Sequence, residues 1–283
     1  MLLKILKTWL AEPSTQGLAL DDPNLTMKRK DILANKAFLR AIYQDWYQLI
    51  LEHIPPGPGK VLELGSGPSF FGEDCPQSVT SDLFWLEGID LVMDALSLPF
   101  RDQSLKAIVM TNVLHHIPQP RCFLAEASRC LRPEGVVVLV EPWYTPWSGW
   151  VYGHLHHEPF DSASQEWEFP PAGPLSGANG ALPWILFERD RPIFEKEFPS
   201  LAIKQINPMM PLRYLVSGGL SMRSLSPARG IPARWSQEAW KALEKALQPL
   251  MKHIGMFALV VLSSAPTAPS LGKDQPAPKT SCW

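Results

Sequence analysis

Polar side chains that could bind a ligand stand where short apolar segments of this sequence end. Four of them occur in order along the chain: Glu63, Asp82, Asp94 and Asn112. Carboxylates and amides accept hydrogen bonds, so together they could bind the hydroxyl groups of a sugar and an amino group. Ligands of open parallel sheets bind at the carboxyl ends of the strands. The spacing therefore predicts one nucleoside-like site that is assembled from several strand ends.

A glycine-rich turn follows the first of these acids, in the stretch E-L-G-S-G-P-S that runs from residue 63 to 69. Gly65 and Gly67 allow the backbone to approach a ligand closely, because glycine has no Cβ. The dinucleotide motif G-x-G-x-x-G requires a third glycine, but Phe70 occupies that position, and no Arg or Lys is near the turn in sequence. The turn therefore favours a ligand with one ribose and no phosphate, and disfavours the alternative of an NAD-type oxidoreductase.

Apolar runs alternate with helical patterns, which predicts a doubly wound, Rossmann-like α/β sheet. The run Val136 to Val140 is continuously apolar, as in a central strand that is buried on both faces. A long helix is expected over 27–53, with Thr26 as its N-cap. The other expected helices cover 120–131, 183–198 and 235–247, and the expected strands cover 61–64, 79–81, 89–93, 105–112, 136–140, 201–206 and 256–262.

Residues 143–180 interrupt this alternation and are rich in tryptophan, glycine and proline. We interpret them as an insertion that forms a lid over the site. Indole rings stack on aromatic, lipidic or glycan ligands, so the tryptophans could contact such an acceptor. A small second core under the lid explains them equally well. A second irregular segment is expected over 208–233.

Histidines supply the candidates for a general base, since the pKa of imidazole lies near neutral pH. His115 and His116 follow the fourth expected strand, and the cluster H-L-H-H-E runs from His154 to Glu158. We favour His116 as the catalytic residue and His157 as the second candidate, against the alternative that these histidines only pack in loops. The cluster has helical spacing that would suit a metal, but nothing else in the sequence completes a set of ligands, so no metal is predicted.

Five motifs in order resemble the class I S-adenosylmethionine-dependent methyltransferases, most closely the small-molecule "type 11" subgroup. They are E-L-G-S-G-P-S, S-D-L, D-A-L-S-L-P-F, N-V-L-H-H-I and L-R-P-E-G-V-V-V-L-V-E-P, within residues 60–142. The resemblance implies a seven-stranded, mostly parallel sheet with an antiparallel last strand. It also implies S-adenosyl-L-methionine as cofactor and methyl transfer to an O, N or C atom of a small molecule. A non-catalytic scaffold of the same fold, which binds the cofactor or another protein, is the alternative.

The resemblance also assigns the cofactor contacts. Glu63, Gly65 and Gly67, with Ser66 in the same turn, would hold the methionine part. Asp82, with Leu83 beside it, would accept hydrogen bonds from both ribose hydroxyls, and Asn112 would pass near the sulfonium. Asp94 would accept from the adenine amino group, and Ala95 and Leu98 would lie beside the ring. The chain departs from the family at Ser69, where a third glycine is usual, and in its short first crossover.

Composition restricts the partners and the cellular compartment. The chain has 283 residues, a formal net charge of −2 and no block of Lys or Arg, which argues against nucleic acid as a partner. Its four cysteines form no C-x-x-C pair, so we expect reduced thiols in a cytoplasmic protein. No apolar run is long enough to span a bilayer.

Three regions are expected along the chain. Residues 27–262 would form the methyltransferase domain. In residues 1–26, apolar side chains and lysines alternate at the start; we favour a short amphipathic helix packed on the domain over an interfacial contact with a membrane. Residues 263–283 are rich in Pro, Ser and Ala, which predicts a disordered tail.

Overall fold

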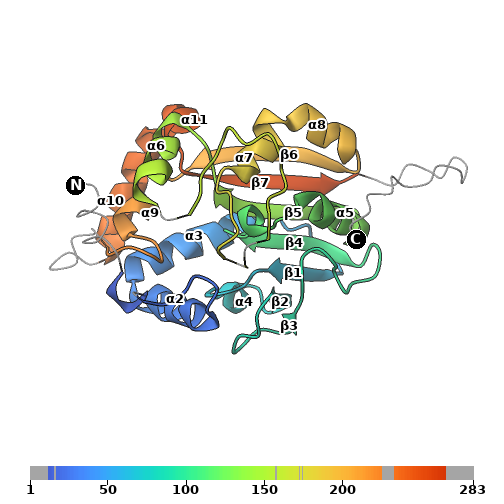
Figure 1. The fold of residues 1–283 in the computed structure, drawn as a ribbon, viewed down its shortest axis with the longest axis horizontal. Helices are drawn as coiled ribbons and strands as arrows, with labels where there is room; N and C mark the ends of the chain where they lie inside the picture. The colour runs from blue at the N-terminus through green and yellow to red at the C-terminus, as the bar shows by residue number, and fades with distance from the viewer. Residues whose placement is uncertain are drawn as a thin grey trace, which may run out of the picture.

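The computed structural model describes residues 12–15, 17–156, 158–171, 173, 175–224 and 233–265, and it does not describe the side chains of 233–235. The central element of the fold is a seven-stranded sheet. The strand order is β3-β2-β1-β4-β5-β7-β6, from the bottom to the top of Figure 1. Strands β1 to β5 pair in parallel, and β7 runs antiparallel to both β5 and β6. The predicted Rossmann-like α/β sheet with an antiparallel last strand is therefore confirmed, whereas the lid remains a prediction. The strands are β1 Lys60–Leu64, β2 Ser78–Asp82, β3 Leu91–Val92, β4 Leu105–Thr111, β5 Leu131–Pro142, β6 Leu201–Met209 and β7 Phe257–Ser264.

Helices cover both faces of this sheet. The α-helices are α2 Pro23–Asn35, α3 Ala37–His53, α4 Phe71–Asp74, α5 Pro120–Cys130, α6 Pro146–Leu155, α7 Leu182–Trp184, α8 Arg191–Glu197, α9 Arg213–Ser217, α10 Ala233–Ala246 and α11 Met251–Ile254. Short 3₁₀ turns occur at η1 Pro13–Thr15, η2 Leu114–His116 and η4 Gln248–Leu250, and η3 Ile185–Arg189 is a π-helical turn. The expected helix 183–198 is therefore divided among α7, η3 and α8, and α9 lies within the segment expected to be irregular.

The prediction of one helix over 27–53 is wrong, because α2 and α3 are separate. The carboxylate of Asp22, not Thr26, caps α2 by accepting from the backbone N–H of Asn24 at 2.9 Å. Lys36 breaks the helix between α2 and α3 with φ −89° and ψ 84°. Its ammonium lies 2.9 Å from the Glu12 carboxylate and donates to the Met222 carbonyl, which fixes the bend.

Strands β3 and β5 differ in length from the expected ones. The third strand was expected over 89–93 but pairs only over Leu91–Val92, because the Asp90 carboxylate turns back to accept from the backbone N–H and the hydroxyl of Thr80. Strand β5 begins at Leu131, which was expected to end the helix over 120–131, five residues before the expected strand 136–140. Glu134 has a left-handed φ of 62° there, and the pairing with β4 shifts in register between Leu105 and Ala107.

The segment 143–180 consists of α6 and a long loop that passes in front of the sheet in Figure 1. Its tryptophans pack against the protein. Trp143 and Trp167 are buried in the core, and the Trp147 indole donates to the Pro211 carbonyl at 3.0 Å. Trp150 is half exposed and stacks on Trp147. These contacts support the interpretation of the tryptophans as packing groups.

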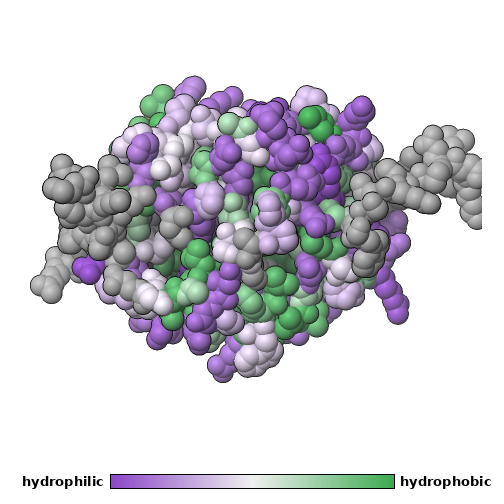
Figure 2. Space-filling view, in the orientation of Figure 1, coloured by the Kyte–Doolittle hydropathy of each residue, from purple (hydrophilic) through white to green (hydrophobic). Residues whose placement is uncertain are grey.

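The face of the molecule seen in Figure 2 is mainly hydrophilic. Hydrophilic side chains cover most of the face in Figure 2, and apolar ones gather in patches in its lower half. Within the described ranges, no helix is both long and apolar enough to cross a membrane.

Cys75 and Cys130 are buried free thiols, as expected, but Cys122 is disulfide-bonded, so the expectation of a reduced thiol is wrong there. Residues 1–11 and 266–283 lie outside the described residues, so the expectations for those termini remain predictions.

The aromatic core between α3 and the sheet gives the first test. Trp46 is fully buried, and its ring centroid lies 4.9 Å from that of Tyr43, 5.6 Å from that of Tyr214 and 5.0 Å from that of Phe257. Trp46→Ala should lower the free energy of unfolding by about 3 to 5 kcal/mol, because the cavity cannot close fully. Urea unfolding measures this loss. Trp85 is 75% exposed, so Trp85→Ala is the control and should change stability by less than about 0.5 kcal/mol. Equal losses in the two variants would contradict the described core.

Candidate functional site

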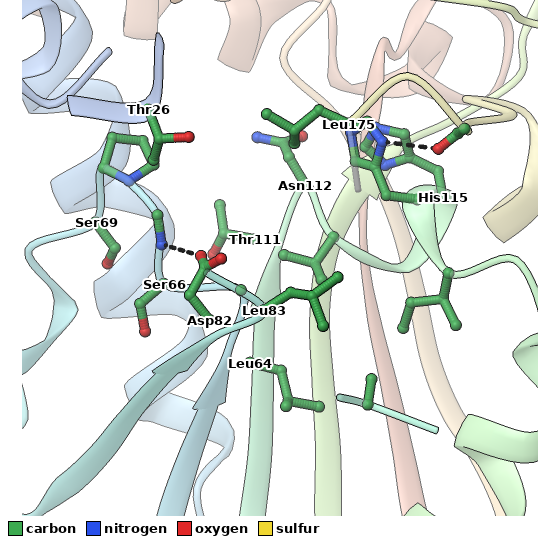
Figure 3. Close-up of a pocket in the computed structure, with 18 of the residues that line it drawn as sticks. Thr26, Leu64, Ser66, Ser69, Asp82, Leu83, Thr111, Asn112, His115 and Leu175 are labelled. Atoms are coloured by element: carbon green, nitrogen blue, oxygen red, sulfur yellow. Dashed lines mark hydrogen bonds between the residues drawn. The ribbon is translucent and has the colours of Figure 1, made fainter. Parts of the chain in front are cut away.

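A cavity of about 530 Å³ lies at the carboxyl ends of the parallel strands. Figure 3 shows side chains from several strand ends turned into it. Every residue predicted to contact the cofactor lines it except Leu98. Leu98 is buried in the core instead, and its backbone N–H donates to the Glu126 carboxylate at 2.8 Å. The residues that line the cavity are Glu63, Gly65, Ser66, Gly67, Asp82, Leu83, Asp94, Ala95 and Asn112.

The glycine-rich turn passes close to the segment that follows β4. Gly65 has a φ of +64°, and a Cβ there would lie 2.6 Å from Cγ2 of Val113. Any side chain would therefore be strained by its backbone and would clash. Gly67 also has a positive φ, and its backbone N–H donates to Oδ2 of Asp82 at 2.9 Å, the bond dashed at the left of Figure 3. The turn is thus tied to the end of β2.

Ser69 replaces the usual third glycine, and its hydroxyl organises the turn. It donates to Oε1 of Glu63 at 2.6 Å and accepts from the backbone N–H of Phe71 at 2.9 Å. The hydroxyl of Tyr47 on α3 lies 2.9 Å away. The departure from the family pattern at this position therefore supplies hydrogen bonds that glycine would lack.

Glu63 is a buried carboxyl with both oxygens occupied. Ser66 donates to Oε2 at 2.8 Å and Ser69 to Oε1, and the residue is 4% exposed. Burial raises the pKa of Glu63 to about 7, although the two serine hydroxyls act in the opposite direction. Burial also raises the pKa of Asp82, against the hydrogen bonds from the backbone N–H groups of Phe84 and Gly67.

The remaining predicted contacts lie farther along the same edge. Asp94 is exposed, and its Oδ1 accepts from the backbone N–H of Leu96 at 2.9 Å. Asn112 has a left-handed φ of 59°, and its backbone N–H donates to the Val140 carbonyl. This conformation ends the pairing of β4 with β5 and turns the chain across the cavity.

The charges around the cavity are unequal. Among the described residues that line it, four carboxyl groups face one guanidinium, that of Arg29 on α2. The carboxyl groups belong to Glu63, Asp82, Asp94 and Glu158. The Nε of Arg29 is buried and has no hydrogen-bond partner. Because a buried donor without a partner is costly, a ligand acceptor at this point would be stabilising. The cavity therefore suits a ligand with cationic groups and one carboxylate.

A second cluster surrounds His115 at the other side of the cavity. The fully buried Glu141 carboxylate accepts from the backbone N–H groups of Val113 and Leu114, both at 2.8 Å. Its Oε2 lies 2.7 Å from Nδ1 of His115. Nε2 of His115 lies 3.5 Å from Oε2 of Glu158. Although burial opposes it, hydrogen bonding to these two acids raises the pKa of His115 to about 9.

His116 lies against His115, with ring centroids 4.2 Å apart. Its Nδ1 is 3.3 Å from the Gly177 carbonyl of the 143–180 segment. Burial and the neighbouring His115 lower the pKa of His116 to about 3, so the ring is neutral at physiological pH. His157 lies outside the described residues, and its role remains a prediction. His154 is exposed and stacks on Trp150 away from the cavity lining.

Three residues that the sequence analysis gave no role shape this site: Arg29, Glu141 and Glu158. Glu141 ends the most apolar strand of the chain, which is the same signal that identified Glu63. Glu158 belongs to the H-L-H-H-E cluster, but its partner His115 comes from 43 positions earlier, so the spacing within the cluster could not indicate it. Arg29 comes from a helix that folds back over the turn, and no local motif marks it.

Comparison with known proteins supports the family resemblance. Residues 76–139 match the family described as "Methyltransferase domain". An uncharacterized methyltransferase of Mycobacterium sp. (strain KMS) is 31% identical over 128 residues, 40% of this chain and 49% of that protein. One from Mycobacteroides abscessus is 28% identical over 155 residues, 46% and 59% of the two chains. The chain thus spans about half the length of these curated relatives.

Solved methyltransferase structures that align with this chain share little sequence identity with it. Geranyl diphosphate C-methyltransferase from Streptomyces coelicolor A3(2) gives a TM-score of 0.48 at 15% identity, over 92% of this chain and 91% of that one. A SAM-dependent methyltransferase from Archaeoglobus fulgidus gives 0.46 at 14% identity, over 80% and 93%.

The match in sequence covers β2 to β5, the strands whose ends carry Asp82, Asp94 and Asn112. Over residues 76–139 this chain is therefore similar to the methyltransferase domain family.

Proposed function

We propose that this protein is an S-adenosyl-L-methionine-dependent methyltransferase that acts on an O, N or C atom of a small molecule. The observation that carries the proposal is the arrangement of complementary groups along one cavity. Asp82 stands at the end of β2, where it can accept from ribose hydroxyls. The unpartnered Nε of Arg29 can donate to the methionine carboxylate, and Glu63 can accept from the methionine amino group.

The chemistry of methyl transfer divides the work between cofactor and protein. The cofactor, when bound, supplies a methyl group attached to a positively charged sulfur, and this sulfur becomes a neutral thioether when the methyl group is transferred. The protein has to bind both reactants, align them and exclude water. The negative cavity lining also suits a sulfonium and an ammonium group, whereas it disfavours the phosphates of a dinucleotide. We therefore propose that Asn112 and Val113, after β4, pass beside the sulfonium.

The acceptor would lie toward His115, His116 and Glu158, beyond the end of β4. A pKa near 3 makes the His116 ring a poor proton acceptor at neutral pH, because an effective general base has a pKa near the working pH. We therefore propose that His116 positions the acceptor and does not remove its proton. The concave cavity and the single guanidinium in its described lining support a small molecule over nucleic acid.

A direct experiment tests the proposal. Pure protein is titrated with S-adenosylmethionine and S-adenosylhomocysteine by calorimetry, and then incubated with S-adenosylmethionine and a panel of phenols, amines and isoprenoids while formation of S-adenosylhomocysteine is followed. Binding together with turnover is expected. Absence of heat with both ligands would overturn the proposal. Binding without turnover on any acceptor would favour a non-catalytic scaffold.

Two substitutions should separate the two halves of the cofactor site. 5′-Methylthioadenosine keeps the adenosine part of the cofactor but lacks the amino-acid carboxylate. Asp82→Asn should weaken the binding of both this compound and S-adenosylhomocysteine by roughly 10- to 100-fold, since it removes a charge-assisted acceptor. Arg29→Met should weaken the binding of S-adenosylhomocysteine by a similar factor and leave the binding of methylthioadenosine almost unchanged.

Calorimetric Kd values measure both effects. Asp31→Asn, at an exposed position on the same helix as Arg29, is the control and should bind like the unsubstituted protein. A parallel loss of both ligands in Arg29→Met would contradict the carboxylate contact.

The raised pKa of Glu63 predicts a pH dependence of stability. An acid whose pKa rises on folding, here from 4.5 to about 7, favours the folded state most when both states are protonated. Its contribution therefore decreases as pH rises from about 4.5 to about 7, by roughly 3 kcal/mol in total. Glu63→Gln removes this loss. The melting temperature of the variant minus that of the unsubstituted protein should therefore be larger at pH 8 than at pH 5.

Thermal unfolding at both pH values measures the difference. Glu73→Gln is the matched control, because Glu73 is an exposed acid on the following helix. Parallel melting curves for Glu63→Gln and the unsubstituted protein at both pH values would contradict a buried, protonatable Glu63.

A further inference from the structure

We infer that His115, His116 and Glu158 bind one divalent transition-metal ion of the Zn²⁺ type at the acceptor end of the cavity. Each residue offers one ligand atom, and these atoms lie within 4.8 Å of one another. Two imidazoles and one carboxylate are a donor set typical of zinc sites that keep a further position open. Each of these residues also lines the cavity, so the open position would face it.

The distances suit a single ion. Ligand atoms bound at about 2.1 Å to one ion lie at most about 4.2 Å apart. Nε2 of His115 and Oε2 of Glu158 are already 3.5 Å apart. Closing the remaining spacing onto an ion requires movements of less than about 1 Å, which side-chain rotation of His116 and Glu158 can supply.

Glu141 prepares His115 for this role. Its Oε1 accepts from the backbone N–H groups of Val113 and Leu114, so its Oε2 is aligned with Nδ1 of His115. A carboxylate that accepts only can hold the ring in the tautomer with its proton on Nδ1. Nε2 then faces Oε2 of Glu158 at 3.5 Å, and a bound ion would displace the proton that Nε2 carries there. A carboxylate behind a metal-binding histidine is a recurrent feature of zinc sites, where it orients the ring and raises its basicity.

The hydrogen bond of His116 leads to the same conclusion. Its Nδ1 faces the Gly177 carbonyl at 3.3 Å, which favours the proton on Nδ1 and leaves Nε2 as the ligand atom. The two rings are tilted by 40° with centroids 4.2 Å apart, so their edges can converge on one point. If the proposed methyl transfer is correct, an ion at this place could bind an acceptor oxygen or sulfur and stabilise its deprotonated form.

The test reads metal binding alone and does not depend on methyl transfer. Metal-free protein is titrated with Zn²⁺ in competition with a chromophoric chelator, and the bound metal is counted by mass spectrometry. Co²⁺ is used in parallel, because its visible absorption reports the coordination. One ion per chain is expected. Glu158→Gln should weaken Zn²⁺ binding by at least about 100-fold, since loss of a ligand exceeds the 10- to 100-fold cost of losing an outer partner.

Glu141→Gln gives a sharper test of the tautomer argument. The amide oxygen can still accept from the two backbone N–H groups, but its NH₂ would donate to Nδ1 of His115. Nδ1 would then accept a hydrogen bond and the ring would keep its proton on Nε2, so Zn²⁺ affinity should fall by about 10- to 100-fold. Circular dichroism and melting temperature check that each variant is folded.

His154→Ala is the control, because His154 is an exposed histidine whose ring stacks on Trp150. It should bind Zn²⁺ like the unsubstituted protein. The inference fails if the unsubstituted chain holds no stoichiometric Zn²⁺ or Co²⁺, or if Glu158→Gln binds undiminished.

Discussion

The buried carboxylate of Glu141 controls the geometry of both ends of the cavity. It accepts from the backbone N–H groups of Val113 and Leu114 and from His115, and thereby fixes the turn that follows β4. Val113 lies in that turn, directly against Gly65 of the glycine-rich turn. His115 follows two residues later and faces Glu158. A single fully buried acid therefore positions the backbone beside the proposed sulfonium and the imidazole beside the proposed acceptor.

Much of the fold, and the residues that line one end of the cavity, could be predicted from sequence, because the signals there are local. Buried parallel strands are short apolar runs, and a polar residue at the end of each run marks the edge at which ligands bind. Glu63, Asp82, Asp94 and Asn112 were identified in this way, and each lines the cavity. Among the residues that the resemblance assigned to the cofactor, Leu98 alone does not line the cavity, because its apolar side chain packs in the core.

The rest depends on contacts between distant segments, and periodicity does not report these. The break between α2 and α3 is held by Lys36, whose partners are Glu12 and the Met222 carbonyl, far away in sequence. Arg29 reaches the cavity only because that break lets α2 fold over the turn. Glu158 meets His115 across the sheet edge. The tryptophans of 143–180 suggested either a ligand surface or a small core, and the burial of Trp143 and Trp167 favours packing.

The two ends of the cavity cannot move independently, and this constrains any reaction that occurs there. Val113 and His115 flank Leu114, which is fully buried, and Glu141 belongs to β5, which pairs with β4 through five successive residues from Ala107 to Thr111. Protein interiors are close-packed, so a displacement of this turn would disturb the central strands. The distance between the glycine-rich turn and the histidine cluster is thus set by the most stable part of the sheet. An acceptor bound at His115 and Glu158 would therefore meet the proposed cofactor at a fixed separation.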